Sequence, residues 1–343
     1  MILVTGGAGY IGSHTVVELQ QQGYDVVIID DLSNSHVDVI DNIEKITGIR
    51  PCFEQFNLSD SEKTDDFFDN YSIDAIIHFA AHKYVGESVK EPLRYYSNNF
   101  ISTLNLLQAA EKYNIKNFVF SSSCTVYGEA EQLPVTEETP IKPAECPYGN
   151  TKQVIEEILR DICLSKPQLQ VISLRYFNPI GAHHSSLIGE LPLGIPQNLV
   201  PYITQTAIGI RERLQVFGKD YNTKDGTCLR DYIHVEDLAK AHVVALSRML
   251  NKGMQNNYEV YNIGTGTPSS VLEVIQSFEK VTGIPLRYRI VGRRNGDVEK
   301  IWADTTLANK VLGWKASYKL DDMMYSAWKW ERKLKIKSQT QLD

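Results

Sequence analysis

The chain has 343 residues, 43% of them hydrophobic and 22% charged, which is ordinary for a globular protein with a substantial core. Its formal net charge of −7, with no long lysine/arginine run before the tail, argues against nucleic acid and anionic membranes as main partners. No apolar run reaches the roughly 18 residues that a membrane-spanning helix needs. The first residues carry no basic segment and no small-residue cleavage site, so we expect no signal peptide.

The five cysteines form no C-x-x-C pair and show no metal-ligand spacing. We interpret them as reduced thiols, which favours a cytoplasmic location. Two histidines are adjacent, His183 and His184, but no acidic ligand lies at metal spacing around them. This pattern favours a solvated loop pair over a zinc site, and we expect no bound metal.

The chain opens with a short apolar strand, residues 2–4, followed by a glycine-rich loop and a predicted helix over residues 13–22. Strand, glycine loop and helix are the context that a dinucleotide-binding fingerprint requires. The loop fits both G-x-G-x-x-G and G-x-x-G-x-x-G. Its glycines would allow a tight turn, and the helix N-terminus would receive a pyrophosphate. The glycines of the loop are Gly6, Gly7, Gly9 and Gly12.

A second predicted strand, residues 25–29, ends at Asp30. An acidic residue about 20 positions beyond the glycine loop accepts hydrogen bonds from the ribose hydroxyl groups of the adenosine. The same carboxylate would repel a 2′-phosphate, so the sequence favours NAD over NADP as the cofactor. The alternative is a surface aspartate after a turn-forming glycine cluster. The order and spacing of the strand, the glycine loop, the helix and the aspartate disfavour this alternative.

Strands and helices continue to alternate up to residue 176, which predicts an α/β fold with a Rossmann-like, doubly wound parallel sheet. Ligands bind at the C-terminal ends of the strands in such sheets. Asn57-Leu58 follow one predicted strand, and residues 80–83 follow another. The further predicted strands are 52–56, 75–79, 117–121 and 171–176, and the further predicted helices are 38–48 and 104–113.

Tyr148 and Lys152 lie four residues apart in a predicted helix whose apolar residues form a stripe. A phenol loses its proton near pH 10, and a neighbouring ammonium group lowers that pKa. The pair could therefore exchange a proton near neutral pH. Taken alone, Tyr-x-x-x-Lys is a common pattern, and an exposed pair on an ordinary helix is the simpler interpretation. The rest of the chain changes that balance.

The alternation weakens after residue 176, where the chain becomes rich in glycine, proline, histidine and serine. We expect a dinucleotide-binding domain over residues 1–176 and a smaller α/β substrate-binding domain over residues 177–343. Segments near residues 230–265 are expected to return to the first domain. The predicted helices of this part are 199–210, 235–251 and 269–282, and its predicted strands are 230–234, 258–264 and 285–291.

Nine segments, in order along nearly the whole chain, resemble the extended short-chain dehydrogenase/reductase family and, within it, the UDP-hexose 4-epimerases. Each segment is weak evidence alone, but nine in order at plausible spacing are very specific. They are TGGAGYIGSH (5–14), HFAAHKYVGES (78–88), FSSSCTVYG (120–128), PYGNTK (147–152), RYFNPIGAH (175–183), GIPQNLVPYI (194–203), DGTCLRDYIHVEDLA (225–239), YNIGTG (261–266) and RRNGDVEKIWAD (293–304).

The resemblance implies a homodimer that interconverts UDP-glucose and UDP-galactose through a 4-keto intermediate, with transient reduction of a tightly held NAD. It implies a catalytic triad of Ser123, Tyr148 and Lys152. The expected cofactor-binding residues are Gly6, Gly7, Gly9, Tyr10, Ile11, Gly12, Asp30, Asn34, Asn57, Leu58, Phe79, Ala80, Lys83, Asn98, Ser121, Tyr148, Lys152 and Tyr176. The expected substrate-binding residues are Ser123, Tyr148, Phe177, Asn178, Asn198, Leu199, Arg230, Arg294, Asp297 and Ile301.

Some of these assignments have structural alternatives. Two arginines suit a diphosphate because the guanidinium fork matches its oxygens. Arg230 could instead form a salt bridge with Asp231 or Asp237. Asn178 could simply cap a strand end.

The sequence departs from the family pattern at two positions. Asn57 stands where the family usually has an aspartate near the adenine, and an amide can still accept a hydrogen bond there. Ile301 stands at a sugar-pocket position that family members fill with a tyrosine or with a small residue. Isoleucine is intermediate in size, so activity on the N-acetylated pair UDP-GlcNAc/UDP-GalNAc is left open.

Two related activities share the loop and the Tyr/Lys pair. A sugar-nucleotide 4,6-dehydratase would need an acid pair after Ser123, where this chain has Cys124 and Thr125. A decarboxylase acting on UDP-glucuronate is disfavoured in the same way, though less firmly. A non-enzymatic protein that only senses NAD would be expected to have a broken triad, and this triad is intact.

Overall fold

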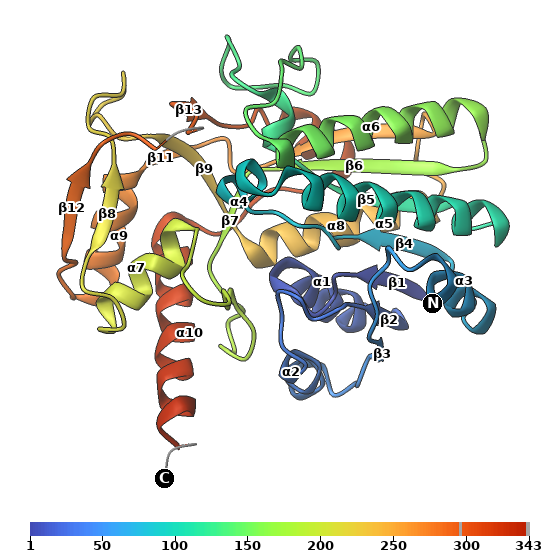
Figure 1. The fold of residues 1–343 in the computed structure, drawn as a ribbon, viewed down its shortest axis with the longest axis horizontal. Helices are drawn as coiled ribbons and strands as arrows, with labels where there is room; N and C mark the ends of the chain where they lie inside the picture. Colours follow the sequence, from blue (N-terminus) through green and yellow to red (C-terminus); the bar gives the residue numbers. More distant parts are fainter. Residues whose placement is uncertain (295–296, 341–343) are drawn as a thin grey trace.

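The computed structural model describes residues 1–294 and 297–340. Its largest element is a parallel seven-stranded sheet with the strand order β10-β6-β5-β4-β1-β2-β3 (Figure 1). This confirms the predicted doubly wound sheet. The strands are β1 (Ile2–Thr5), β2 (Val26–Ile29), β3 (Cys52–Glu54), β4 (Ala75–His78), β5 (Asn117–Ser123), β6 (Gln170–Tyr176) and β10 (Tyr258–Ile263).

Alternate residues of each strand enter the two apolar layers that flank the sheet. Ile2 and Val4 of β1 belong to one buried cluster, and Leu3 belongs to the other. This is the two-residue period of a strand that is covered on both faces. The first layer is covered by α1 (Tyr10–Gln21), α2 (Asp38–Thr47) and α8 (Val235–Leu250), and the second by α3 (Ser61–Asn70), α5 (Pro92–Lys112) and α6 (Pro147–Ser165).

Two helices of this part were not predicted. One is α3, which is capped by the carboxylate of Asp60 but has a strongly charged sequence with only two phenylalanines on its buried face. The other is the short α4 (Val85–Lys90). The predicted helix over 104–113 is the second half of α5, which begins twelve residues earlier with Pro92 in its first turn.

Two elements from late in the chain belong to the large sheet. Helix α8 packs on it, and β10 forms its edge beside β6. Two smaller sheets lie beside it, at the left of Figure 1, with three helices packed on their apolar sides. Their strands are β7 (Asn178–Ile180), β8 (Leu214–Phe217), β9 (Leu229–His234), β11 (Pro268–Ser270), β12 (Tyr288–Val291) and β13 (Lys300–Ile301). Their helices are α7 (Leu199–Ala207), α9 (Val271–Thr282) and α10 (Leu320–Thr340).

The predicted strand over 230–234 is confirmed as β9, and the predicted strand over 285–291 begins later, as β12. Strands β7, β8, β11 and β13 were missed because most are only two or three residues long. Two irregular turns complete the chain, a 3₁₀ turn at Cys124–Tyr127 and a π turn at Ala308–Leu312.

Within the part of the chain that the structure describes, no helix is both long and apolar enough to cross a membrane.

Candidate functional site

The glycine loop joins β1 to α1 in a turn that requires glycine at two positions. Gly6 has a φ of +68°, and a Cβ there would lie 2.8 Å from the backbone nitrogen of Ala80. A Cβ on Gly12 would lie 2.2 Å from the carbonyl oxygen of Gly6. No side chain caps the N-terminus of α1 after Gly9. The bare backbone and the open helix N-terminus therefore fit the pyrophosphate of a dinucleotide.

Asp30 lies directly after β2, beside this loop. Its Oδ2 atom accepts a hydrogen bond from the backbone N–H of Ala8 (3.1 Å), and its Oδ1 atom accepts from the N–H of Leu32 (2.9 Å) and the hydroxyl of Ser35 (3.0 Å). Burial raises the pKa of Asp30, and these hydrogen bonds oppose the increase. The carboxylate is therefore held firmly at the place where dinucleotide folds bind the ribose.

Asn57, the first departure from the family pattern, is paired with a neighbouring acid. Its Nδ2 atom donates to Oδ2 of Asp31 (2.7 Å), and its Oδ1 atom accepts from the backbone N–H of Ser59 (2.8 Å). An aspartate at position 57 would place a second negative charge against Asp31, which is unfavourable. The amide at position 57 is thus matched to the acid at position 31.

A cleft runs along the C-terminal ends of the strands, and most of the predicted cofactor-binding residues line it. Two of them, Gly7 and Ser121, do not. A Cβ on Gly7 would lie 2.8 Å from the side chain of Ile28, so this glycine allows close packing beneath the cleft. The predicted residues that line the cleft are Gly6, Gly9, Tyr10, Ile11, Gly12, Asp30, Asn34, Asn57, Leu58, Phe79, Ala80, Lys83, Asn98, Tyr148, Lys152 and Tyr176.

Other residues of the cleft wall were missed by the sequence analysis. Most follow the ends of β2, β3 and β4 directly, so the rule that ligands bind at strand ends could have found them. Glu87, Arg94 and Ser102 come from helices and carried no such signal. The residues not predicted individually are Ile29, Asp31, Ser33, Ser35, Phe56, Ala81, His82, Tyr84, Glu87, Arg94, Ser102 and Leu193. Among them, Ala81 and His82 belong to the strand-end segment 80–83 that the sequence indicated.

Tyr148 and Lys152 lie in the first two turns of α6 and are both buried. The Nζ atom of Lys152 donates to the carbonyl oxygen of Ser121 (2.7 Å), while Ser121 Oγ lies 2.7 Å from the hydroxyl of Tyr176. Ser121 therefore supports two residues of the cleft from behind it.

The expected lowering of the Tyr148 pKa by Lys152 is not found in this structure. Burial raises the pKa of Tyr148 well above its ordinary value, and the Ser123 hydroxyl acts in the opposite direction. Burial also lowers the pKa of Lys152 to about 7, and the charge of Glu156 opposes that decrease. Burial determines both shifts, because both side chains are removed from water and the Lys152 ammonium group points to a carbonyl oxygen.

Ser123 ends β5, and its Oγ atom accepts a hydrogen bond from the backbone N–H of Thr125 (3.2 Å). The hydroxyl of Thr125 is itself buried and has no hydrogen-bond partner among the residues that the structure describes. A buried hydroxyl without a partner is costly unless another molecule satisfies it. Thr125 is thus a further candidate for contact with a ligand, and its sequence carried no signal of this.

A buried ion pair lies beneath the triad. Glu156 of α6 accepts two hydrogen bonds from Nε and one from Nη2 of Arg175 on β6, at 2.5–3.2 Å. It also accepts from the hydroxyl of Ser122 (2.5 Å). The Nη1 atom of Arg175 donates to the hydroxyl of Tyr127, which donates to Asn262 of β10. The network joins α6 to three strands of the large sheet.

Apart from Tyr148, the predicted substrate-binding residues do not line the cofactor cleft. Phe177 and Ile301 are buried in a small apolar cluster with Cys124 and Tyr127. Cys124 directly follows Ser123 in the chain, and Tyr127 lies in the turn that comes next. Ile301 pairs with Arg230 across β13 and β9. Cys124 and Tyr127 follow β5, Phe177 lies between β6 and β7, and Ile301 belongs to β13, so segments distant in sequence meet beside the end of β5.

The two predicted diphosphate arginines differ in their surroundings. Within residues 1–294 and 297–340, Arg230 makes no ion pair, and its Nη1 atom donates to backbone carbonyl oxygens. The alternative of a salt bridge to Asp231 or Asp237 is therefore not found. Arg294 donates to both carboxylate oxygens of Asp297, at 3.1 and 2.6 Å. Two residues of this predicted charged segment, 295 and 296, lie outside the described residues.

The remaining predicted substrate residues lie at the starts of elements. Asn178 begins β7, and Leu199 begins α7. Asn198 precedes α7 without capping it, and its Nδ2 atom donates to Glu190 Oε1 (2.5 Å).

The prediction of a solvated histidine pair is wrong for one of its members. His184 is exposed, but His183 is buried, and the fold brings Glu236 to both of them from 52 residues away. Spacing along the chain could not reveal this neighbour, because the contact is made by the first turn of α8.

Comparisons with known proteins identify the family of the chain. The family described as GDP-mannose 4,6 dehydratase matches residues 3–327. The chain is 51% identical over 330 residues to the UDP-glucose 4-epimerase of Dictyostelium discoideum, covering 96% of this chain and 95% of the relative. A crystal structure of UDP-glucose-4-epimerase from Stenotrophomonas maltophila, with bound NAD and formylated UDP-arabinopyranose, is 49% identical, covers 98% of each chain and superposes with a TM-score of 0.94.

A second structure, UDP-glucose 4-epimerase from Bifidobacterium longum in complex with NAD+ and UDP, is 47% identical with a TM-score of 0.93, covering 97% of this chain and 98% of that one. Such likeness extends over nearly the whole chain. The chain therefore belongs to the extended short-chain dehydrogenases/reductases, and among them to the UDP-glucose 4-epimerase family.

We predict that Gly12→Ala destabilises the folded protein by about 1–3 kcal/mol, the usual cost of overpacking a tight contact. The added methyl group would meet the Gly6 carbonyl oxygen, which is backbone and cannot rotate away. Urea unfolding measures the change. Gly86→Ala is the matched control, because a Cβ there meets no atom within 4 Å. Equal stability of the two variants would contradict the close approach.

Proposed function

We propose that the protein interconverts UDP-glucose and UDP-galactose with NAD as a bound cofactor. One observation carries the proposal: Tyr148 and Lys152 face the dinucleotide cleft, while Ser123 leads into the apolar cluster that holds Phe177 and Ile301. A sugar held there would lie between the proton-transferring residues and the nicotinamide end of the cleft. Full-length relatives and structures named UDP-glucose 4-epimerase support this assignment.

The cofactor assignment rests on the charge and shape of the cleft. Asp30, held by three hydrogen bonds, favours ribose hydroxyl groups over a 2′-phosphate, and hence NAD over NADP. The glycine loop leaves its backbone bare for the pyrophosphate. Lys83 and Asn98 line the same cleft. Bound NAD supplies an acceptor, and later a donor, for the hydride of the sugar C4.

In the proposed reaction, the hydroxyl group on C4 loses its proton to Tyr148 while the hydrogen on C4 leaves as hydride. Ser123 hydrogen-bonds the same oxygen and can relay the proton. Lys152 would hold the nicotinamide ribose, and its positive charge would favour the phenolate form of Tyr148 over the phenol. The resulting 4-keto sugar turns about its link to the diphosphate. The hydride then returns to the opposite face of C4, and the C4 oxygen takes the proton back from Tyr148.

The diphosphate would be held by Arg230 and Arg294, because guanidinium groups bind phosphate oxygens in pairs. Arg230 is partly buried without an ion-pair partner among the described residues, which leaves its charge for a ligand. Arg294 would have to exchange part of its contact with Asp297. Tight binding of the nucleotide and loose contact with the sugar are what allow the keto sugar to turn.

A dehydratase activity is not favoured, although the matching family bears that description. Elimination across C5 and C6 would need an acid pair after Ser123. The chain has Cys124 and Thr125 there, and burial raises the pKa of the Cys124 thiol to about 12. A thiol that holds its proton so strongly is a poor base.

We further propose a cytoplasmic homodimer whose chain forms two domains, divided near residue 176. Helix α8 and strand β10 come after this boundary but belong to the first domain. All five cysteines are free thiols, which suits a reducing compartment. The helices α5 and α6 lie side by side on the large sheet (Figure 1). They present exposed apolar residues that would suit a dimer interface, namely Leu93, Ile101, Leu104 and Leu164.

The first test is the reaction itself. Pure protein mixed with UDP-galactose should form UDP-glucose without added NAD, because the cofactor is expected to copurify. Chromatography of the nucleotide sugars measures the product. A 4-keto-6-deoxy product would identify a dehydratase, and the absence of any product, even with added NAD, would contradict the proposal.

We predict that Tyr148→Phe lowers the turnover rate at least about a hundredfold, the usual contribution of a general acid/base, while UDP still binds. The phenyl ring keeps the packing of the buried side chain but cannot carry the proton. Tyr325→Phe is the control, because Tyr325 is an exposed tyrosine on α10. Near-normal turnover of Tyr148→Phe would show that the proton takes another route.

We predict that the enzyme also turns over the N-acetylated pair, more slowly than the plain pair. Ile301 is buried beside Phe177 and is stiff at χ1, so it leaves some room but cannot swing aside. An added group in an apolar pocket is discriminated by about 1–3 kcal/mol. Ile301→Tyr should suppress the N-acetylated reaction selectively, and Ile301→Gly should favour it. An unchanged ratio of kcat/KM values in both variants would remove Ile301 from the pocket wall.

A further inference from the structure

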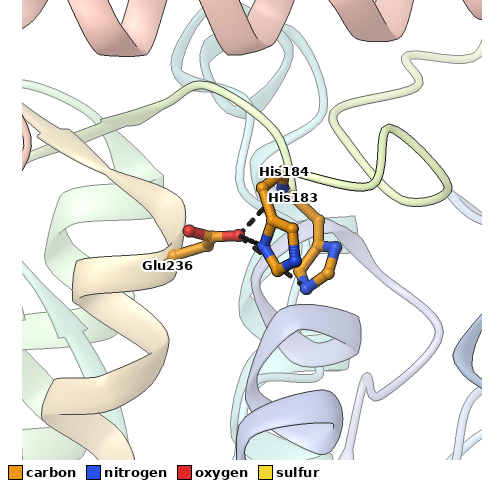
Figure 2. A group of neighbouring side chains, drawn as sticks. All are labelled: His183, His184 and Glu236. Carbon is orange, nitrogen blue, oxygen red and sulfur yellow. Dashed lines mark hydrogen bonds and ion pairs between the residues drawn. The ribbon is translucent and has the colours of Figure 1, made fainter. Parts of the chain in front are cut away.

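The fold brings three metal-ligand side chains together at the start of α8. His183 and His184 lie in the loop after β7, and Glu236 lies in the first turn of α8 (Figure 2). The Oε1 atom of Glu236 lies 3.0 Å from Nδ1 of His184 and 3.8 Å from Nε2 of His183. The three ligand atoms all lie within 4.8 Å of one another, so a small shift of the side chains would bring them around one ion.

The outer contacts of these residues direct the ligand atoms inward. Nδ1 of His183 lies 2.8 Å from the hydroxyl of Ser185 and accepts from the backbone N–H of Ser185 (3.2 Å), while Nε2 faces the carboxylate at 3.8 Å. Because Nδ1 accepts, Nε2 carries the proton of the neutral ring, and an ion bound there would displace it. The hydroxyl of Tyr318 donates to Oε2 of Glu236 (2.5 Å), while Oε1 accepts from the backbone N–H of His184 (3.0 Å) and faces both rings. Second contacts of this kind fix the orientation of ligands in metal sites. The pair of rings, 4.0 Å apart, is visible in Figure 2.

A third histidine adjoins the cluster. The ring centre of His14, on α1, lies 6.2 Å from that of His183. His14 is buried, and its Nε2 atom has no hydrogen-bond partner among the residues that the structure describes. Its other nitrogen is 2.7 Å from the carbonyl oxygen of Tyr10. A buried nitrogen without a partner marks a place where the local hydrogen bonding is incomplete.

We propose that His183, His184 and Glu236 bind one divalent transition-metal ion, with zinc as the fitting probe. Two imidazoles and a carboxylate are a donor set that zinc accepts, with water in the fourth position. Water can enter from the solvent side, because the His184 side chain is 74% exposed. The site is separate from the triad, and it does not depend on the proposed reaction.

Binding there would connect the loop after β7 to the start of α8. The same loop is joined to the cofactor cleft, because the hydroxyl of Tyr10 donates to the carbonyl oxygen of Gly181 (2.6 Å). An ion would therefore stabilise the loop next to the cleft. Its expected role is structural, since none of its three ligands lines the cleft.

The test uses full-length protein without a histidine tag, freed of metal with EDTA. Titration calorimetry with ZnCl₂ should give one ion per chain, and Co²⁺ should give the visible absorption bands of a tetrahedral site. His184→Ala and Glu236→Gln should each weaken zinc binding at least about tenfold, because each removes one of three ligands. His36→Ala is the control, because His36 is an exposed histidine outside the cluster and its loss should change nothing.

Three results would overturn the proposal: no saturable zinc binding, binding that His184→Ala leaves unchanged, or an equal loss in His36→Ala. The three side chains would then form only a hydrogen-bonded cap on α8. Because Glu236 also accepts from Tyr318, a circular-dichroism melt of Glu236→Gln must show a folded protein, and His184→Ala decides the matter if it does not. Epimerase activity is measured separately, so the failure of either assignment is recognised independently.

Discussion

The buried carboxylate of Glu156 fixes the helix that carries Tyr148 and Lys152 to the sheet beneath it. Both Glu156 and Arg175 are almost fully removed from water, which is costly unless every charge is paired and hydrogen-bonded. Here the pairing is nearly complete, because Arg175 and Ser122 occupy the carboxylate oxygens. Such a pair adds little net stability, but it has few alternative arrangements. We infer that it sets where α6 lies relative to the end of β5.

This arrangement explains why Lys152 and Tyr148 have unusual pKa values. Lys152 lies one turn from Glu156 on the same buried face of α6, and the carboxylate is the neighbouring charge that stabilises its ammonium form. Burial still prevails for both residues of the pair. A proton-transferring tyrosine in this place therefore needs a further positive charge close by, and an oxidised nicotinamide ring carries one. The fold brings Tyr148 and Lys152 together, and bound NAD would supply the further positive charge.

Much of the dinucleotide-binding part of the chain could be predicted from the sequence, because the patterns that indicate it are local. A glycine loop between a strand and a helix, and an acid at the end of the next strand, are read directly from a few neighbouring residues. Asp30 and Gly12 lie where that pattern predicts. The pattern did not distinguish residues that line the cleft from those that support it, as Gly7 and Ser121 show. Gly7 packs against Ile28, and the carbonyl oxygen of Ser121 accepts from Lys152. A sequence pattern does not reveal these orientations.

The part of the chain predicted to bind the substrate was harder to predict, because its contacts join residues that are distant in sequence and its strands are short. No local pattern announces the two residues of β13, or that Ile301 pairs with Arg230. The same holds for Glu236, which reaches the histidine pair only through the start of α8. The motif resemblance supplied Arg230 and Ile301 as site residues, whereas the cluster around His183 had no motif and was misjudged.

Asp231 holds two segments of this part of the chain in place, in addition to its apolar core. It is fully buried, and its carboxylate accepts hydrogen bonds from the backbone N–H groups of Thr265, Gly266 and Ala303. These residues follow β10 and β13, so a single side chain of β9 holds both segments. Its two neighbours in the chain are Arg230 and Tyr232, whose side chains point to the opposite face of the strand. The acid that was considered as a salt-bridge partner of Arg230 instead fixes the strand that carries Arg230.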